Sequence, residues 1–285
     1  MFPEHTHCLL CGSPEYGVLP REYAHAYLVQ CQDCGFVFGR RIPTGQELNE
    51  HYAKYPRGTS LSPVTVKRYE ELLEQFEPYR KTNRLLDIGC GDGHFLAVAK
   101  SKGWEVYGTE FTDEAVQIGS AKGIHMHKGL IQEWSGPEEF DVITSFEVLE
   151  HINDGNAHVQ KIASLLRRGG LFYFTTPNFN SLSRRILGGQ WKIIEYPEHL
   201  CYYTAGSSFR LLTQAGLQRL NLRTTGIALH RFPKDGNTGN FVAKQEELRT
   251  SIEENRVLQM VKGMINSVLN VLRAGDTLKG FYVRP

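Results

Sequence analysis

The sequence contains no run of about 18 apolar residues, the minimum for a helix that crosses a membrane. It also has no excess of charge, because 32 Lys and Arg stand against 31 Asp and Glu, a formal net charge of +1. This balance does not favour a protein that binds nucleic acid over its whole surface. The segment MFPEHTHCLLCG lacks the charged start and the apolar stretch of a secretory signal. We therefore expect a cytoplasmic protein with no membrane partner.

Cysteine is scarce, and its six copies are not distributed as a disulfide framework would be. Four of them form two Cys-x-x-Cys pairs, Cys8 with Cys11 and Cys31 with Cys34. This spacing predicts a zinc site. Because four thiolates close the tetrahedral shell, we expect the metal to be structural rather than catalytic. A redox pair and four unrelated buried thiols are the alternatives.

The chain is expected to form two unequal domains. Residues 1–56 are interpreted as a small zinc ribbon and its linker, with strand character over Tyr23–Gln30. The linker contains Pro43, Pro56 and Gly58, and we place the boundary near residue 57. Residues 57–285 then form the second and larger domain.

Strand and helix patterns alternate through this larger domain. Such alternation predicts a parallel sheet with helices on both faces. The expected strands are Arg84–Ile88, Glu105–Thr109, 124–128, Phe140–Ser145 and Leu171–Thr176, and strand patterns are also present in Leu217–Thr225 and Lys279–Arg284. The fold class is therefore α/β, a parallel sheet with helices on both faces, plus the N-terminal zinc ribbon.

Residues 227–275 separate the last two of these strand segments. We expect a loop in the first part of this range and a helix from about Lys244 to Leu272. Its apolar stripe consists of Val257, Met260, Val261, Met264, Ile265, Val268 and Leu272. We favour a stripe that packs on the domain or on a second copy in a homodimer. A lid over the substrate is the alternative.

A glycine-rich turn follows the first strand of the larger domain. Gly89, Gly91 and Gly93 allow a sharp turn and a close approach of a ligand to the backbone. Glu110 ends the next strand, where an acid can bind both ribose hydroxyls of a nucleoside. Asp87 precedes the turn, and a carboxylate there suits a cationic ligand, although it can also act as a turn cap.

The segments LLDIGCGDGHFL, GTEFTDEA, FDVITSFEVLEHI and LLRRGGLFYFTTPN together resemble class I S-adenosylmethionine-dependent methyltransferases. The resemblance implies S-adenosylmethionine as cofactor. It also implies a Rossmann-like seven-stranded mostly parallel sheet that ends in an antiparallel C-terminal hairpin of Leu217–Thr225 and Lys279–Arg284. It implies that the methionine part lies against Asp87, Gly89, Cys90 and Gly91. It also implies that Glu110 holds the ribose, that Phe111 and backbone near Leu130 meet the adenine, and that Phe146 and Glu147 border the acceptor.

The segment WKIIEYPEHLCYYTAGS, after the fifth strand, is expected to form the acceptor wall. A methyl acceptor must be aligned and, when it is a carbon or a hydroxyl, must lose a proton. Neighbouring carboxylates orient an imidazole and stabilise its charged form, so His199 is the preferred general base. A structural histidine bonded to the backbone is the alternative. His151 is a second candidate base, for which a structural role is favoured.

Tyr196, Glu198 and His199, together with the zinc module, resemble the sugar C-methyltransferases of deoxysugar pathways. That resemblance implies a nucleotide-linked keto-sugar as small-molecule acceptor. Three alternatives stay open: an O-methyltransferase of a polysaccharide or secondary-metabolite pathway, a zinc-ribbon RNA methyltransferase, and a catalytically silent binding protein. Arg21 is the only Lys or Arg between Cys8 and Cys34, so a nucleic-acid partner is not favoured.

Overall fold

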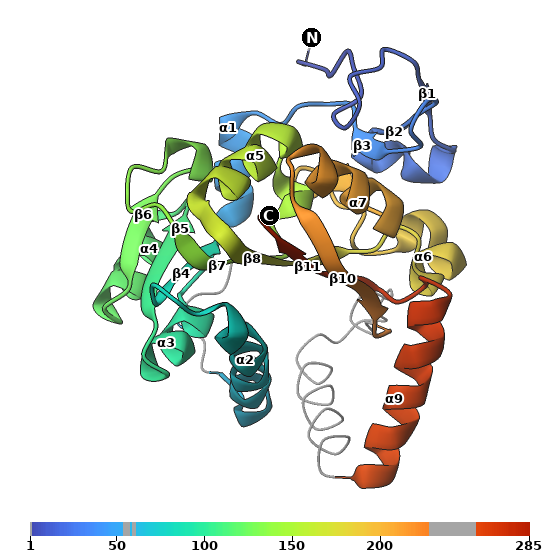
Figure 1. Ribbon diagram of the computed structural model, residues 1–285. Helices are drawn as coiled ribbons and strands as arrows, with labels where there is room; N and C mark the ends of the chain where they lie inside the picture. Colours follow the sequence, from blue (N-terminus) through green and yellow to red (C-terminus); the bar gives the residue numbers. More distant parts are fainter. Residues whose placement is uncertain (1, 54–57, 59–60, 228–254) are drawn as a thin grey trace.

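A seven-stranded sheet forms the centre of the chain, of which the computed structural model describes residues 2–53, 58, 61–227 and 255–285 (Figure 1). Its strands are β4 (Arg84–Ile88), β5 (Glu105–Glu110), β6 (His125–Lys128), β7 (Phe140–Phe146), β8 (Leu166–Pro177), β10 (Gln218–Thr225) and β11 (Thr277–Val283). The spatial order is β10-β11-β8-β7-β4-β5-β6. Strands β4 to β8 pair in parallel, whereas β11 is antiparallel to both β8 and β10. The predicted fold class is confirmed.

β8 and β11 begin earlier than predicted, β11 at Thr277 instead of Lys279. β8 starts at Leu166 instead of Leu171, because Leu166 pairs with Phe140 at the beginning of β7. The neighbouring strand extends the pairing through a segment whose Arg and Gly residues give little local strand signal.

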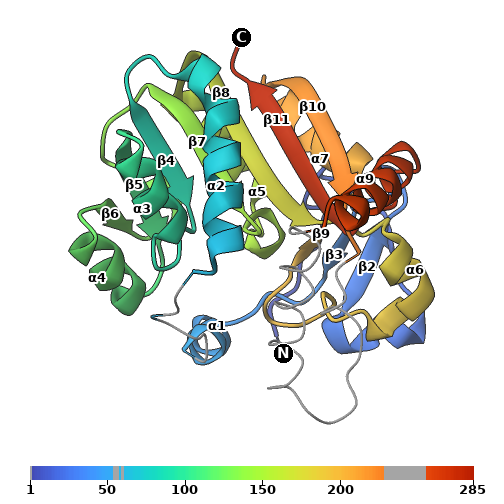
Figure 2. The ribbon, with the colours of Figure 1, turned by 90° about the horizontal axis from the view of Figure 1, so that it is seen from below.

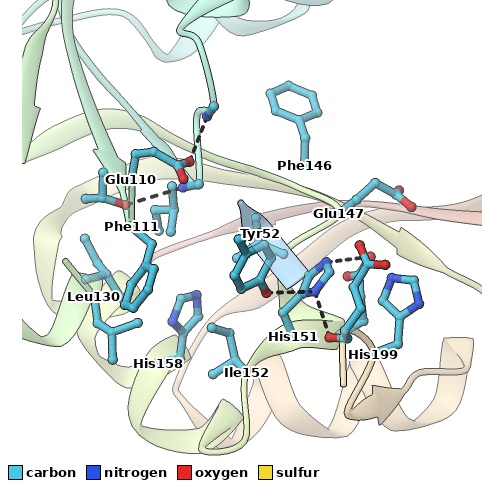
Figure 3. A pocket seen from close by; sticks show the side chains of 18 of the residues that line it. Tyr52, Glu110, Phe111, Leu130, Phe146, Glu147, His151, Ile152, His158 and His199 are labelled. Atoms are coloured by element: carbon cyan, nitrogen blue, oxygen red, sulfur yellow. Dashed lines mark hydrogen bonds and ion pairs between the residues drawn. The ribbon is translucent and has the colours of Figure 1, made fainter. Parts of the chain in front are cut away.

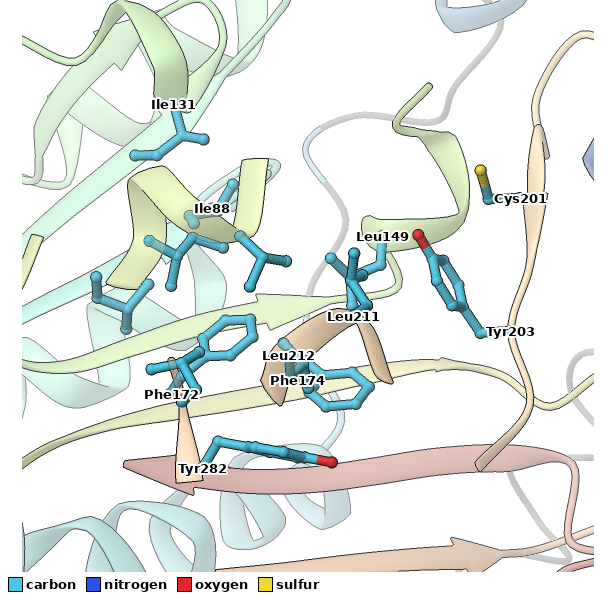
Figure 4. Close-up of a cluster of buried hydrophobic side chains, with 14 of the residues drawn as sticks. Ile88, Ile131, Leu149, Phe172, Phe174, Cys201, Tyr203, Leu211, Leu212 and Tyr282 are labelled. Carbon is cyan, nitrogen blue, oxygen red and sulfur yellow. The ribbon is translucent and has the colours of Figure 1, made fainter. Parts of the chain in front are cut away.

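The sheet buries a separate apolar core on each face, because side chains of successive strand residues point to opposite sides. Leu85 and Val142 pack under α2 (Pro63–Phe76) and α3 (His94–Ser101). Leu86 and Ile143 pack under α5 (Gly155–Leu165) and α7 (Ala205–Gln214). Leu211 and Leu212 of α7 belong to the same cluster (Figure 4), and α7 lies on the face of the sheet opposite to α2 (Figures 1 and 2). Because helices cover both faces of the sheet, a ligand can approach the strands only at their ends.

Further helices lie at the margins of the sheet. They are α4 (Asp113–Ala121), which contacts β6, α6 (Leu182–Leu187), α9 (Arg256–Val271), and the short 3₁₀ helices Glu77–Tyr79, Ile131–Glu133, Leu149–His151 and Gly188–Gln190.

A second sheet lies beside the four clustered cysteines, of which Cys31 ends one of its strands. It contains β1 (Tyr16–Val18), β2 (Leu28–Cys31), β3 (Val37–Gly39) and β9 (Cys201–Tyr202), all antiparallel. We call residues 2–39 the cysteine module. β9 comes from the body of the chain, so the sheet of the module continues into the larger part of the protein. The predicted boundary near residue 57 lies outside the described residues.

The predicted strand over Tyr23–Gln30 is wrong for its first half. Residues Arg21–Ala26 form a 3₁₀ helix, and only Leu28 onward is extended. Tyr23 and Ala26 are both buried, and residues three apart lie on the same side of a 3₁₀ helix. The three-residue spacing of these two buried side chains fits a 3₁₀ helix and not a strand, in which every second residue would be buried.

Helix α9 presents its apolar stripe away from the sheet, contrary to the expectation that the stripe packs on the domain. Its inward side carries Leu269 together with Asn266 and Asn270, whose amide oxygens accept hydrogen bonds from backbone N–H groups of Gly226 and Thr224. All seven predicted stripe residues are exposed. The predicted loop and the first part of the predicted helix fall within residues 228–254, outside the described residues. No helix in the described ranges is long and apolar enough to cross a bilayer.

A buried carboxylate ties β7 to the segment that precedes β4. Asp141 is fully buried and accepts hydrogen bonds from the backbone N–H groups of Lys81 (2.7 Å) and Thr82 (2.6 Å). Its other oxygen accepts from Arg167 Nε at 2.5 Å, and the same guanidinium donates to the carbonyl of Tyr79. The charge of Asp141 is therefore fully compensated inside the protein.

Removal of this carboxylate should destabilise the fold, because it leaves the Arg167 guanidinium and two N–H groups without their acceptor. We expect Asp141→Ala to lower the free energy of unfolding by about 3–5 kcal/mol, as measured by urea denaturation. Asp113→Ala is the matched control, since Asp113 pairs with Lys128 in an exposed ion pair. That variant should change stability by less than about 1 kcal/mol. Equal stabilities for the two variants would contradict this assignment.

Candidate active site

A cavity of about 460 Å³ lies at the carboxyl ends of β4, β5 and β7 (Figure 3). Its volume is within the range of about 300–1,000 Å³ typical of sites for small molecules and cofactors. Its position agrees with the general rule that parallel α/β sheets bind ligands beyond their carboxyl ends. The lining includes Leu48, Tyr52, Gly89, Gly91, Glu110, Phe111, Leu130, Phe146, Glu147, Glu150, His151, Ile152, His158, Ile193, Glu198 and His199.

The glycine turn after β4 forms one end of this cavity. Gly89 and Gly91 have φ angles of +65° and +53°, a region that favours glycine. A Cβ atom on Gly89 would lie 2.6 Å from Val148 Cγ2, so a side chain does not fit there. The N–H of Gly91 donates to Glu110 Oε2 at 3.0 Å, which ties the turn to the end of β5. The structure therefore brings together the predicted glycines and the predicted acid.

Asp87 and Cys90, which were expected to line the methionine part, do not line the cavity. Asp87 is buried beside β7 and accepts a hydrogen bond from Thr144 Oγ1 at 2.7 Å. Burial raises the pKa of its carboxyl to about 8, and this hydrogen bond opposes the increase. Cys90 Sγ lies 3.8 Å from Met126 Sδ, and burial raises the pKa of its thiol. The side chains of Asp87 and Cys90 thus pack on the side of the turn that faces away from the cavity.

Phe111 and Leu130 line the cavity beside Glu110, and the side chains of both are half-exposed (Figure 3). Phe146 ends β7, and Glu147 follows it with a φ of +53°. All four residues line the cavity. Their arrangement offers an apolar surface next to an acid that can accept hydrogen bonds from hydroxyl groups.

Two histidines lie together at the opposite end. The ring centroids of His151 and His199 are 4.9 Å apart. Nδ1 of His151 lies 2.9 Å from the carbonyl oxygen of Glu198, and Nδ1 of His199 lies 2.6 Å from that of Ile193. A carbonyl oxygen only accepts, so each Nδ1 carries a hydrogen and each neutral ring keeps its lone pair on Nε2. An imidazole fixed in this way can act as a base.

The charge state of His151 follows from its burial. Burial lowers the pKa of His151 below its usual value of 6.5, and the carboxylate of Glu198 partly offsets this effect. The imidazole is therefore neutral at pH 7, as a general base requires.

Glu150 is a site residue that the sequence analysis missed. Its side chain is only 2% exposed and accepts a hydrogen bond from Thr176 Oγ1 at 2.8 Å. Donor atoms of Glu150, His151 and His199 lie within 4.8 Å of one another, close enough to hold a cation. His51, Glu195 and Glu198 have the same spacing. The adjacency of Glu150 to His151 is the signal that could have identified it.

The predicted group of Tyr196, Glu198 and His199 does not converge as a unit. Glu198 and His199 line the cavity, whereas Tyr196 is not among the lining residues. The Tyr196 hydroxyl donates to Glu47 Oε2 at 3.4 Å, and its ring packs against Tyr27. The segment is irregular, so sequence spacing does not determine which of its side chains point inward.

Tyr52 and Leu48 also line the cavity and were not predicted. Both belong to α1 (Gly45–Tyr52), which directly follows the cysteine module in the chain. The linker sequence indicates a short helix, but it contains no signal that this helix reaches a site formed by β4, β5 and β7.

Comparison with known proteins identifies the fold and the family. A family described as "Methyltransferase domain" matches residues 64–222, more than half of the 285 residues. A curated relative from Aromatoleum aromaticum, named ubiquinone biosynthesis O-methyltransferase, is 28% identical over 49% of this chain. The chain spans 65% of that relative's length.

Two solved structures share the fold at low sequence identity. One is a S-adenosylmethionine-dependent methyltransferase from Archaeoglobus fulgidus, with a TM-score of 0.52, 19% identity, and coverage of 76% of this chain and 94% of that one. The other is the [4+2]-cyclase SpnF, with a TM-score of 0.57, 14% identity, and coverage of 86% and 97%. The fold is thus that of S-adenosylmethionine-dependent methyltransferases, and the chain belongs to the methyltransferase-domain family.

Proposed function

We propose that this protein transfers the methyl group of S-adenosylmethionine to an oxygen of a small hydroxylated molecule. The observation that carries the proposal is that one cavity contains both the Gly89–Glu110 cofactor end and the His151–His199 pair. The curated relatives named as O-methyltransferases support oxygen as the acceptor atom. A cytoplasmic location and a homodimer remain predictions.

In this reaction an acceptor oxygen attacks the methyl carbon in line with the carbon–sulfur bond, and the electron pair of that bond stays on sulfur. The acceptor proton must leave, and His199 Nε2 is the proposed base, with His151 as the second candidate. The Ile193 carbonyl holds the His199 ring in position through Nδ1. Correct placement of the oxygen near a neutral imidazole supplies both alignment and proton removal.

A second candidate function is methylation of a carbon in a nucleotide-linked keto-sugar. The cysteine module and the segment from Tyr196 to His199 favour it, although Tyr196 does not line the cavity. Methylation of RNA is less favoured, because the cations next to the module are already paired. Arg40 forms an ion pair with Glu4 at 3.1 Å, and Arg41 forms one with Glu47 at 2.6 Å.

We also propose that the cysteine module binds one structural zinc ion. Cys8 Sγ lies 3.5 Å from Cys34 Sγ, and Cys11 Sγ lies 3.6 Å from Cys31 Sγ. A tetrahedral site with bonds of about 2.3 Å places its sulfurs about 3.8 Å apart. All four sulfurs lie within 4.8 Å of one another, so this side-chain set fits zinc with little rearrangement.

Loss of Glu110 should weaken cofactor binding, because its carboxylate is the proposed partner of two ribose hydroxyls. We expect Glu110→Ala to raise the Kd for S-adenosylmethionine at least about tenfold in calorimetry. Glu110→Gln should be affected less, because its amide oxygen can still accept the Gly91 N–H. Glu114→Ala, an exposed residue in the first turn of α4, is the control. Unaltered binding by Glu110→Ala would rule out this role.

Methyl-labelled S-adenosylmethionine tests the acceptor class and the base together. The protein is offered catechol, nucleotide-linked keto-sugars and total RNA in separate reactions, and we expect label on an oxygen of the small hydroxylated molecule. With that acceptor, His199→Ala should reduce turnover about 100-fold or more because the proton has no acceptor in place. Its affinity for S-adenosylmethionine should be unaltered.

His7→Ala serves as the control for the histidine variant, since His7 is exposed and does not line the cavity. Normal turnover by His199→Ala would transfer the role to His151. Label only on a sugar carbon would support the second candidate, and label only on RNA would contradict a small-molecule acceptor.

Zinc removal should destabilise the protein, because metal binding supplies folding energy to so small a module. We expect about one zinc per purified chain and a chelator-induced decrease in Tm of roughly 5 °C or more. In Cys11→Ser the same chelator should cause little further decrease. The zinc site would be disproved if the purified protein contained no zinc and its Tm did not change when the chelator was added.

A further inference from the structure

We propose that the cysteine module positions the segment of the acceptor site that carries His199, and that Tyr52 on α1 contacts the acceptor. The inference rests on the proposed methyl transfer and assigns to the module a role in acceptor binding. We call residues 191–200 the acceptor loop, because His199 lies on it.

The module holds the C-terminal end of the acceptor loop by backbone pairing. Phe38 of β3 pairs with Cys201 of β9, and the N–H of Gly39 donates to the carbonyl of Leu200 at 2.8 Å. His199 directly precedes Leu200. The position of this imidazole is therefore set by a strand edge that the module supplies.

The module also holds the start of the same loop. A ring nitrogen of His25 donates to the carbonyl of Ile194 at 3.0 Å. Trp191, which is 1% exposed, and Ile194 pack in one buried cluster with Tyr23 and Leu28 of the module. Both ends of the acceptor loop thus rest on residues that precede position 40.

Helix α1 lies next to this loop and is tied to it. The Thr44 side chain accepts a hydrogen bond from the Glu47 N–H, and the Thr44 N–H donates to the Glu47 carboxylate, which fixes the start of the helix. Glu47 also pairs with Arg41 at 2.6 Å. At the other end of α1, His51 Nε2 lies 3.2 Å from Glu198 Oε2. The helix and the loop therefore form one connected wall.

Tyr52 is the residue of this wall that stands between the two ends of the cavity (Figure 3). Its ring centroid is 6.4 Å from that of Phe111, and its hydroxyl oxygen is 3.5 Å from His151 Nδ1. The hydroxyl therefore lies in the part of the cavity that contains the histidines. An acceptor oxygen held beside them would come within reach of this phenol.

The charge state of Tyr52 fits this role. Burial, reinforced by the carboxylates of Glu198, Glu110 and Glu150, raises the pKa of its hydroxyl to about 12. The group therefore stays a neutral donor throughout the pH range in which enzymes work. A donor of this kind orients an oxygen without adding charge next to a cationic methyl donor.

The glycine turn and Glu110 at the cofactor end are built by elements outside this wall, and the wall meets Phe111 through the ring of Tyr52, which Tyr52→Phe retains. Gly89, Gly91 and Glu110 come from the segments between β4 and α4, and neither the module nor α1 contributes them. Perturbation of the wall should therefore alter acceptor KM and leave S-adenosylmethionine affinity intact. A general loss of structure would alter both.

The first test is Tyr52→Phe, with catechol or the small-molecule acceptor that takes up the methyl label. We expect acceptor KM to rise about tenfold and the Kd for S-adenosylmethionine to stay within about twofold. Tyr16→Phe is the matched control, since Tyr16 lies in the module, does not line the cavity, and donates to the His5 carbonyl. An unaltered KM for Tyr52→Phe would overturn the contact. Absence of methyl transfer by the wild type would instead refute the proposed function.

The second test needs no turnover and probes the support of the loop. Leu28 and Val29 are neighbours on β2, each 1% exposed, but only Leu28 packs in the cluster with Trp191. We expect Leu28→Ala to shift the emission of Trp191 to longer wavelength, measured as the difference from the same variant with Trp191→Phe. Val29→Ala should not shift it, and both should bind S-adenosylmethionine normally. An unshifted emission, or equal shifts in both variants, would overturn the role of the module.

Discussion

The pairing of β3 with β9 is the contact on which the acceptor half of the cavity depends. β9 is only two residues long, and a strand of that length persists only where an existing edge supplies its hydrogen bonds. The edge belongs to a module of three- and four-residue strands, which is too small to hold an apolar core without help. Four gathered thiols and packing against the acceptor loop supply that help, so module and loop stabilise each other.

The cofactor half depends on contacts that are close in sequence or set by the regular sheet. Gly89 and Gly91 take positive φ angles in the residues directly after β4, and Glu110 ends the adjacent strand. Such positions can be predicted, because strand periodicity sets the sheet and glycine marks the turns. The sequence therefore predicts the fold class and the seven-stranded sheet correctly, and the structure joins Gly91 to Glu110, two residues that the sequence assigns to cofactor binding. Asp87 and Cys90 also sit at the predicted turn, but sequence alone does not decide whether a side chain faces the cavity or its supporting layer.

The acceptor half could be predicted only in part, because its geometry arises from contacts between distant segments. His199 and Glu198 were identified from their residue types, and both line the cavity. Tyr196 was assigned to the same group, yet its ring packs on Tyr27 and its hydroxyl meets Glu47. Nothing in the local pattern around residue 196 encodes a partner some 150 positions away. Two further features also depend on contacts with distant segments and were not predicted. They are the 3₁₀ helix at Arg21–Ala26 and the position of α1 at the cavity.

The proposed cofactor half and the proposed acceptor half of the cavity come from different parts of the chain. One common fold could therefore serve different acceptors. The family match begins at residue 64, after the cysteine module and α1, so the region shared with relatives contains the cofactor end. It also contains His151, His199 and the acceptor loop, but not α1, which carries Tyr52, or the strand edge that holds the loop. The proposed histidine pair can thus stay on the common domain while part of the proposed acceptor surface is supplied by an N-terminal segment. Since a fold does not fix an acceptor, the residues before position 64 are where the specificity of this chain should be sought.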